Sequence, residues 1–385
     1  MTSSLVVFGE DWGRHPRSTQ HLVRRLAADR AVLWVNSIGM RRPKLTVRDL
    51  KRAATKVLGS RAPYSSEAGR CPDARNADKP AALPNNLTTV SPLVVPWPGS
   101  RLAFAANRTL LARQLQPLLA ERCMTRPMLW TSLPTALPVL GKLGERAVIY
   151  YCGDDFGALA GVDHAPVLEM EAALVKKADL VLAASETLAA RFPSSKTLLV
   201  PHGADIALFA NPAPPAADFV RIGRVAGFYG SLADWIDIEL LAFAARELPD
   251  WRFVFIGAIE TDVAPLRTLS NVAFLGPRAH HELPGYVQHW QVSLLPFRDC
   301  AQIRACNPLK LREYLAAGPE IVATDFPALD PYRDFVTVAR KREDFVAAIR
   351  ASAFAPDRSS DRRARVRAET WEARAAQVAT ALEAL

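Results

Sequence analysis

Short apolar runs alternate with longer amphipathic stretches along almost the whole chain. In the first half these runs are rich in Val, Leu, Ile and Tyr, which is typical of buried strands in parallel sheets. They are Leu5–Phe8, Ala31–Asn36, Met128–Ser132, Ala147–Cys152, Leu180–Ser185 and Thr197–Pro201. Helical patterns fill most of the gaps. Because parallel strands need crossover connections, the alternation predicts an α/β fold.

A second series of apolar runs begins after Ala210–Arg224, an alanine- and proline-rich stretch without periodicity that predicts a linker. The runs are Val225–Gly230, Trp251–Gly257, Val272–Gly276, Val292–Phe297 and Glu320–Asp325. The two series predict two Rossmann-like domains in tandem. We expect one domain over residues 1–205 and a second over residues 206–360. One amphipathic helix over 361–385 should pack back toward the first domain.

Between Arg41 and Asn86 the alternating pattern fails, which predicts a long surface excursion with one amphipathic helix. The chain carries a formal net charge of +9, and much of the excess lies in Met40–Pro63 and near the C-terminus. Such a charge favours an anionic partner. A basic, partly apolar segment is typical of a surface for anionic lipid, with a solvated face as the alternative. Nucleic acid is not expected, because no helix-turn-helix, zinc-finger or RNA-recognition pattern is present.

The composition is that of an ordinary globular protein, with 385 residues of which 50% are hydrophobic. The five cysteines are scattered without a C-x-x-C pair, which favours a reduced, cytoplasmic protein without a structural metal. The N-terminus does not resemble a signal peptide, and no apolar run approaches the roughly 20 residues of a membrane span. There is no G-x-G-x-x-G after a first strand, no P-loop and no G-x-S-x-G elbow.

The stretch NPLKLREYLAAG has the marks of a short helix with an anion site. We expect Asn307 as its N-cap, Pro308 at its first position and Gly318 just past its end. Lys310 then lies in the first turn, where orphan N–H groups and the lysine would attract a phosphate, and Glu313 follows one turn later. The alternative is an ion pair between these two residues on a solvated helix.

The segments FYGSLADWIDIELL, WRFVFIG, NVAFLGPRAHHELPGYVQHWQVSLLPF and NPLKLREYLAAG follow one another in the second half. Together they resemble the nucleotide-sugar domain of GT-B glycosyltransferases of the family 4 type. The resemblance implies an N-terminal acceptor-binding domain over residues 1–205 and a C-terminal nucleotide-sugar-binding domain over residues 206–360, with a cleft between them. PHGAD and TWEARAAQV extend the resemblance to the domain boundary and the closing helix. The resemblance implies that Lys310 faces the donor diphosphate and that Glu313 accepts hydrogen bonds from the ribose diol. It also implies no metal and no cofactor besides the nucleotide diphosphate sugar, with a UDP-sugar preferred.

Two departures from the family pattern narrow the resemblance. Ala305 stands where many family 4 enzymes have a first glutamate, and GSLADW stands where they often have an arginine and a lysine. The chain is therefore more similar to bacterial teichuronic-acid and exopolysaccharide transferases and to xanthan-type glucuronosyltransferases. Arg298 is a further candidate for the diphosphate. The expected donor-binding residues are Gly230, Ser231, Arg278, Arg304, Asn307, Pro308, Lys310 and Glu313.

Two adjacent carboxylates, Asp154 and Asp155, follow the Ala147–Cys152 strand and are the catalytic candidates. Ligands of α/β folds bind at this end of the strands, and an acceptor hydroxyl must lose its proton to a base. Asp154 resembles the base of the glucuronosyltransferases; the alternative is an aspartate that caps the next helix.

Three other segments carry candidate side chains near strand ends or turns. Asp11, Trp12 and His15 follow the first strand as acceptor contacts, with His15 as a second candidate base. His202, in PHGAD, is a candidate contact to the transferred sugar or a structural turn residue. The pair His280 and His281 is interpreted as a solvated helix start.

These observations predict a glycosyltransferase that moves a sugar from a nucleotide diphosphate sugar to a saccharide acceptor, lipid-linked in the preferred version. It would act in cell-surface or exopolysaccharide synthesis, peripherally at the inner face of the plasma membrane. Two alternatives stay open. One is a nucleotide-sugar epimerase of the same architecture, and the other is a non-catalytic binding subunit of a polysaccharide assembly. The sugar, the acceptor, the oligomeric state and the anomeric outcome are left open.

Overall fold

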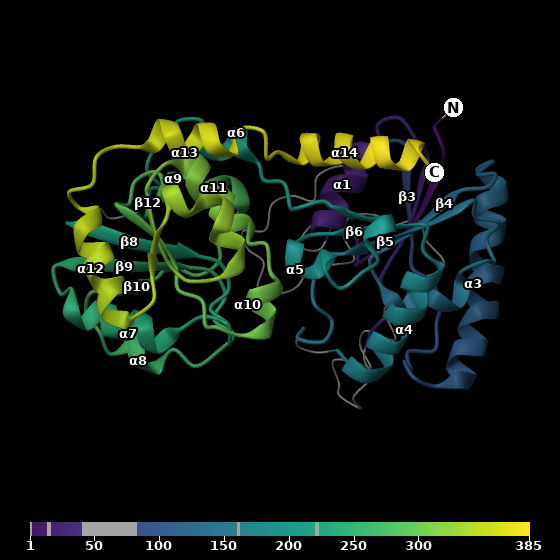
Figure 1. The fold of residues 1–385 in the computed structure, drawn as a ribbon, viewed down its shortest axis with the longest axis horizontal. Helices are drawn as coiled ribbons and strands as arrows, with labels where there is room; N and C mark the ends of the chain where they lie inside the picture. Colours follow the sequence, from purple (N-terminus) through teal and green to yellow (C-terminus); the bar gives the residue numbers. More distant parts are fainter. Residues whose placement is uncertain (1, 14–16, 41–82, 160–161, 220–222) are drawn as a thin grey trace. The chain divides into compact units, whose positions relative to one another are not determined.

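The computed structural model describes residues 2–13, 17–40, 83–159, 162–219 and 223–385. These residues form two compact units (Figure 1). The first comprises the described residues up to Pro201 together with Arg374–Leu385, and the second comprises His202–Ala373. His15, most of the Arg41–Asn86 excursion and the basic segment after Met40 lie outside the described residues.

The first unit is built on a parallel sheet, which among the described residues has seven strands in the order β3-β2-β1-β4-β5-β6-β7. Its strands are β1 (Leu5–Phe8), β2 (Val32–Val35), β3 (Leu87–Val90), β4 (Met128–Thr131), β5 (Ala147–Cys152), β6 (Leu180–Ala183) and β7 (Thr197–Leu199). Its helical elements are α1 (Ser18–Leu26), α3 (Arg101–Glu121), η1 (Pro134–Val139), α4 (His164–Lys177), α5 (Glu186–Ala189) and η2 (Ser194–Lys196). The strands β1, β2, β4 and β5 are buried along their whole length, as their apolar runs predict.

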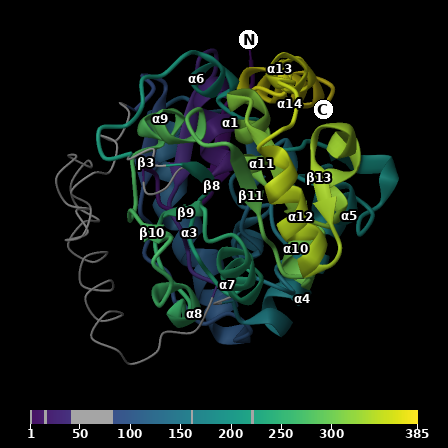
Figure 2. The same ribbon diagram turned by 90° about the vertical axis from the view of Figure 1, so that its left-hand side faces the viewer.

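The second unit has a parallel sheet with six described strands in the order β10-β9-β8-β11-β12-β13. They are β8 (Arg224–Tyr229), β9 (Trp251–Ile256), β10 (Val272–Phe274), β11 (Val292–Leu295), β12 (Glu320–Thr324) and β13 (Thr337–Ala339). The helical elements are α6 (Ile206–Ala210), α7 (Ile238–Glu247), α8 (Ala264–Arg267), η3 (His280–Glu282), α9 (Pro284–Val287), α10 (Ala301–Ala305), α11 (Leu309–Ala317), η4 (Pro327–Phe335), α12 (Arg342–Ser352) and α13 (Ser359–Val366). Helix α12 packs beside β12 and β13 and against α7. Figure 2 shows it next to β13. Helix α14 (Trp371–Glu383) begins in the second unit and continues in the first.

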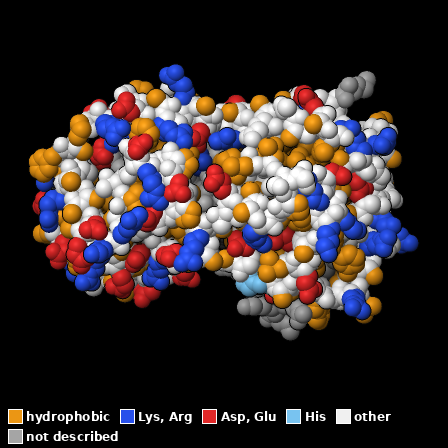
Figure 3. Space-filling view, viewed as in Figure 1, with side chains coloured by type: hydrophobic (Ala, Val, Ile, Leu, Met, Phe, Trp, Pro, Cys, Tyr) orange, Lys and Arg blue, Asp and Glu red, His pale blue; other side chains and the backbone are white. Residues whose placement is uncertain are grey.

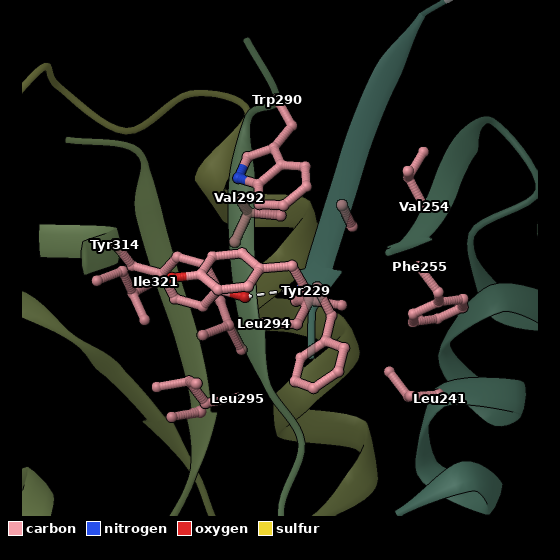
Figure 4. Close-up of a cluster of buried hydrophobic side chains, with 14 of the residues drawn as sticks. Tyr229, Leu241, Val254, Phe255, Trp290, Val292, Leu294, Leu295, Tyr314 and Ile321 are labelled. Carbon is pink, nitrogen blue, oxygen red and sulfur yellow. Dashed lines mark hydrogen bonds between the residues drawn. The ribbon is translucent and has the colours of Figure 1, made fainter. Parts of the chain in front are cut away.

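Aromatic side chains fill the core of the second unit (Figure 4). Trp290 packs so closely on β8 that a Cβ atom at Gly227 would lie 1.9 Å from its ring, which requires glycine at that position. Tyr229 and Tyr314 meet edge to face with their ring centroids 5.1 Å apart. These contacts fix the end of β8 against α11, where the candidate donor site lies.

Three sequence-based expectations are wrong in detail. Strands β3 and β13 were not predicted. The stretch expected as a linker is bound to the second unit, because Ala216 N–H donates to Gly285 O at 2.9 Å and Ala213 N–H donates to Gln288 Oε1 at 2.9 Å. The closing helix is not continuous over 361–385, since α13 ends at Val366 and α14 begins at Trp371.

Candidate donor and acceptor sites

Two glycines end neighbouring strands of the second sheet. Gly230 follows β8 with a φ of +129°, and Gly257 follows β9 with a φ of +145°, a backbone region that other residues rarely adopt. The amide of Gly230 donates to Ile256 O at 2.7 Å, and a Cβ atom at Gly257 would lie 2.2 Å from Gly230 O. The two strand ends therefore form a backbone surface without side chains, here called the glycine surface, at the carboxyl edge, where parallel sheets bind ligands.

Lys310 lies directly over this surface. A Cβ atom at Gly230 would lie 2.2 Å from its Cε and 2.7 Å from its Nζ, and the ammonium is 5.8 Å from the centre of the Phe228 ring. Burial lowers the pKa of Lys310, while the nearby Glu313 carboxylate opposes the shift. Within the part of the chain that the structure describes, no carboxylate or carbonyl forms a hydrogen bond or ion pair with this ammonium. An anionic ligand would supply the missing partner.

Glu313 is buried, with 6% of the residue exposed, so the interpretation of this helix as solvated is wrong. Its Oε1 lies 2.8 Å from His280 Nε2, and its Oε2 accepts a hydrogen bond from the hydroxyl of Tyr229. His280 is thus a site residue that the sequence interpretation missed when it treated the histidine pair as a solvated helix start. The two residues are 33 positions apart, and no local pattern signals the contact.

The start of α11 differs from the expectation. Pro308 takes the N-cap position with a φ of −69°, and Leu309 is the first helical residue. Asn307 does not cap the helix; its Oδ1 accepts a hydrogen bond from Arg312 Nη1 at 2.5 Å. Lys310 still lies in the first turn, and Gly318 ends the helix with a φ of +101°, as predicted.

Three of the expected donor-binding side chains contact other residues of the second unit. Ser231 Oγ donates to Glu260 Oε1 at 3.3 Å. Arg278 is 2.5 Å from Asp218 Oδ2 and donates to the hydroxyl of Tyr286 at 2.9 Å, and Arg304 makes a two-point contact with Asp299 at 2.6 and 2.7 Å. The structure therefore brings together Gly230, Lys310 and Glu313, and it engages Arg278 and Arg304 with carboxylates. Arg298 contributes a backbone hydrogen bond from its N–H to Trp235 O.

In the first unit, Asp154 and Asp155 differ in their surroundings. Asp155 Oδ1 accepts hydrogen bonds from Arg191 Nη1 at 2.8 Å and from Gly157 N–H at 2.9 Å, which is a structural arrangement. Asp154 has a half-exposed side chain, and its Oδ2 lies 3.4 Å from Arg17 Nη1. Although about half of the side chain is accessible, the surrounding protein partly desolvates the carboxylate and raises the pKa of Asp154, and the charge of Arg17 acts in the opposite direction. Asp154 is thus the more exposed of the two carboxylates, with 48% of its side chain accessible against 24% for Asp155.

Glu10 is a second acidic residue at the same edge of this sheet, and the sequence analysis did not single it out. It follows β1, and its Oε1 is buried without a hydrogen-bond partner among the described residues. Burial raises the pKa of Glu10. Hydrogen bonds from its own backbone and from Gln20, together with the positive charge of Arg17, act in the opposite direction and lower it. Because Arg17 acts on both Glu10 and Asp154, the two carboxylates share one electrostatic environment.

The expected acceptor contacts Asp11 and Trp12 are held by the backbone and side chains around β2. Asp11 Oδ1 accepts from Ser37 N–H at 3.2 Å, and Trp12 N–H donates to Asn36 Oδ1 at 3.0 Å. The Trp12 ring is half-buried and meets Trp34 edge to face, with ring centroids 4.8 Å apart.

In the second unit, His202 lies beside Trp371 with ring centroids 6.4 Å apart. Among the described residues, no group of three His, Cys, Asp or Glu side chains could hold a metal ion.

No protein-family model matches the chain. Over 230 residues it is 30% identical to TuaH of Bacillus subtilis (strain 168), which is provisionally named as a teichuronic acid biosynthesis glycosyltransferase. The match covers 54% of this chain and 57% of TuaH, so the chain spans little more than half the length of this curated relative.

Solved structures match over nearly the whole length. Sucrose-phosphate synthase from Thermosynechococcus elongatus superposes with a TM-score of 0.68 at 17% identity, over 99% of this chain and 98% of that one. Anabaena HepE in complex with UDP and glucose superposes with a TM-score of 0.67 at 12% identity, over 100% of both chains. The chain has the GT-B fold. In GT-B terms, the first unit is the N-terminal Rossmann-like domain, and the second, with Lys310 and Glu313, is the C-terminal one.

Proposed function

We propose that this GT-B chain is a glycosyltransferase that moves a sugar from a nucleotide diphosphate sugar to a hydroxyl of a saccharide acceptor. The observation that carries the proposal is the Lys310 ammonium, which lies over the glycine surface at the end of β8 in the first turn of α11. A diphosphate there would meet a positive charge and the N–H groups of a helix N-terminus. HepE, which has the same fold, is known with UDP and glucose bound, and the name of TuaH refers to glycosyl transfer in polysaccharide synthesis.

The donor binds in this proposal without a metal or other cofactor. Lys310 offsets the charge of the diphosphate as the bond between the anomeric carbon and the diphosphate oxygen breaks. Glu313 accepts hydrogen bonds from the ribose hydroxyls, because each carboxylate oxygen has a second lone pair beside the one already used. The tight packing of Lys310 on Gly230 fixes the position of the positive charge before the donor arrives.

The acceptor is activated by Asp154 in this proposal. As the acceptor oxygen forms its bond to the anomeric carbon, its proton passes to the Asp154 carboxylate. The carboxylate is accessible to an acceptor, and the charge of Arg17, 3.4 Å away, favours the deprotonated form that can take up a proton. Asp155 holds the loop through Arg191 and takes no part in proton transfer.

A lipid-linked acceptor would require the chain to meet a membrane, and one surface of the first unit fits such a partner. No described helix is both long and apolar enough to cross a bilayer. The five side chains of this apolar surface are between 37% and 84% exposed: Leu93, Val95, Trp97, Leu102 and Leu110. Asn107 on α3 binds the backbone N–H and C=O of Val95 at 2.7 and 2.9 Å, which holds the strand-like segment beside the helix.

Three exposed arginines of α3 accompany the apolar surface: Arg101, Arg108 and Arg113. Figure 3 shows basic and hydrophobic side chains close together over this part of the first unit. Tryptophan prefers the membrane interface, and each basic side chain near anionic lipid contributes about 1 kcal/mol. The proposed partner of this surface is therefore an anionic bilayer.

The donor site is tested by nucleotide binding. Purified protein is titrated calorimetrically with UDP, UDP-sugars and the corresponding guanosine and adenosine compounds. We expect one nucleotide to bind, and Lys310→Ala to weaken its binding by about 1.5–3 kcal/mol, because a charge-assisted contact is lost. Lys341→Ala, which removes an exposed lysine of the same unit, should bind as the parent does. Equal affinities of parent and Lys310→Ala would contradict the proposed site. Incubation with donor alone, followed by sugar analysis, separates a transferase from an epimerase.

A further inference from the structure

The hydrogen bond between His280 and Glu313 joins an exposed side chain to a buried one. The imidazole is 43% exposed, the carboxylate is 7% exposed, and His280 Nε2 lies 2.8 Å from Glu313 Oε1. A carboxylate can only accept hydrogen bonds, so the imidazole donates. The contact crosses from η3, which follows β10, to the second turn of α11.

The imidazole is held in place by its neighbours. Phe209 is fully buried and meets the His280 ring edge to face, with centroids 5.4 Å apart and planes at 61°. The same phenyl ring stacks on Tyr229 at 6.2 Å, and the Tyr229 hydroxyl donates to the second carboxylate oxygen. At the start of η3, Glu282 Oε2 accepts from Ala279 N–H at 2.8 Å and fixes the turn.

These contacts clamp the carboxylate of Glu313 from both sides. One donor on each oxygen fixes the carboxylate plane, and about two of its four acceptor positions stay available. Two neighbouring hydroxyls can use both remaining positions only if the plane has one defined orientation. A carboxylate with a single protein donor would rotate about its last torsion angle, which is soft in glutamate.

We propose that His280 is a positioning residue of the donor site, which holds Glu313 in the orientation that receives the two ribose hydroxyls of the nucleotide. The inference rests on the proposed function and assigns His280 an action through Glu313. Because His280 would affect the nucleotide only through Glu313, the loss of its imidazole should weaken nucleotide binding only while the Glu313 carboxylate is present.

The test is a double-mutant cycle on the binding of UDP, or of the nucleotide that the screen identifies. His280→Ala should raise the dissociation constant about tenfold, because one donor to a charged group is lost. His280→Gln keeps an N–H donor on a side chain of comparable reach and should restore most of the affinity. In the Glu313→Ala background, His280→Ala should change the dissociation constant by less than about twofold.

Two controls separate this inference from simpler explanations. His281→Ala removes the exposed neighbouring imidazole and should leave binding unchanged. The thermal midpoint of each ligand-free variant shows whether the fold is intact. Equal effects of His280→Ala in both backgrounds would overturn the positioning role and indicate a direct ligand contact, and no effect in either would overturn it as well. If the parent binds no nucleotide at all, the proposed function itself fails.

Discussion

A single side chain, Asp154, carries the chemical step of the proposed reaction. Asparagine matches its size and keeps much of its hydrogen bonding, but it cannot take a proton. We expect Asp154→Asn to lower turnover by about 10²–10⁴ and to leave nucleotide affinity nearly unchanged. Asp155→Asn is the matched control, since Asp155 is bound to Arg191 and Gly157. Activity of Asp154→Asn within a few-fold of the parent would exclude Asp154 as the base and turn attention to Glu10.

Glu10 gives a prediction about pH. Its pKa is raised by burial in the folded chain, so folding favours its protonated form. Its contribution to stability is therefore greatest below the pKa of the unfolded state and falls as pH rises through the folded pKa. We expect Glu10→Gln to unfold at a higher temperature than the parent at pH 7, and the difference to shrink toward pH 4. The measurement is thermal unfolding of both proteins across this range. A difference in unfolding temperature that grows toward pH 4 would contradict a raised pKa of Glu10 in the folded chain.

The site residues differ in how well the sequence could predict them. Lys310 and Glu313 belong to one short helix whose motif and stop signal are local, so their common location could be predicted. His280 depends on a contact with Glu313, 33 positions further along the chain, and nothing in its immediate sequence signals that contact. The burial of Glu10 likewise becomes visible only in the fold. Arg278 lies in one of the segments that carry the family resemblance and was expected to bind the donor. Its pairing with Asp218 requires the fold, because the two residues are 60 positions apart.

At the scale of elements, one buried carboxylate ties α11 to the chain that follows α13. Glu369 Oε2 accepts from Arg312 Nε at 2.7 Å and from the Tyr332 hydroxyl at 2.5 Å, and its Oε1 accepts from Arg365 at 2.8 Å. Burial alone would raise the pKa of Glu369, but Arg312, Tyr332 and Arg365 together hold it below the ordinary value. The cluster thus fixes the helix that carries Lys310.

Removal of this carboxylate should be costly. Glu369→Gln leaves the buried guanidinium of Arg312 without its counter-charge, and we expect a loss of about 3–5 kcal/mol in the free energy of unfolding at pH 7. Because the folded pKa is lowered, the stability from Glu369 is present above the unfolded pKa and is lost as pH falls through the folded one. Urea unfolding at pH 7 and at pH 3 to 5 tests both points. Glu383→Gln, at an exposed position, is the control. Equal stabilities of parent and Glu369→Gln would show that the cluster is not stabilising.

The strands that the sequence predicted and those it missed differ in their place in the sheet. The boundaries of β1 and β5 agree with the predicted runs, because these strands are buried on both faces and carry continuous apolar sequence. Strands β3 and β13 lie at sheet edges, are partly exposed and contain threonine, so they lack that signal. The linker predicted over Ala210–Arg224 was wrong for a different reason. Its proline-rich sequence lacks periodicity, but its backbone groups find partners on α9 and in the residue that follows it.

At the scale of the whole molecule, the two Rossmann-like units could be predicted because each repeats the alternation of strand and helix. The apolar surface beside α3 could not, because its residues look like core positions in the sequence and only the fold exposes them. Because these apolar side chains are exposed, we expect the protein to bind lipid vesicles.

We expect the full chain to sediment with vesicles that contain phosphatidylglycerol more than with phosphatidylcholine vesicles. The double substitution Trp97→Ser and Leu102→Ser should reduce the bound fraction, since these side chains are 53% and 84% exposed and would enter the interface. Phe354→Ser removes a 76% exposed ring from the second unit and should not change binding. Equal sedimentation of the double variant and the parent would exclude this surface as the lipid contact.

The path of α14 affects the order in which the units can be completed during synthesis. Val378 and Leu382 are fully buried, and Gln377 Nε2 donates to Leu199 O at 2.9 Å, so the first unit needs the residues after Arg374 to close its core. The ribosome makes all of the second unit between these two parts. The second unit can therefore finish folding while the first still exposes the apolar surface that α14 will cover. A nascent chain must keep that surface from aggregating until α14 emerges, and chaperones that bind exposed apolar segments would act during that interval.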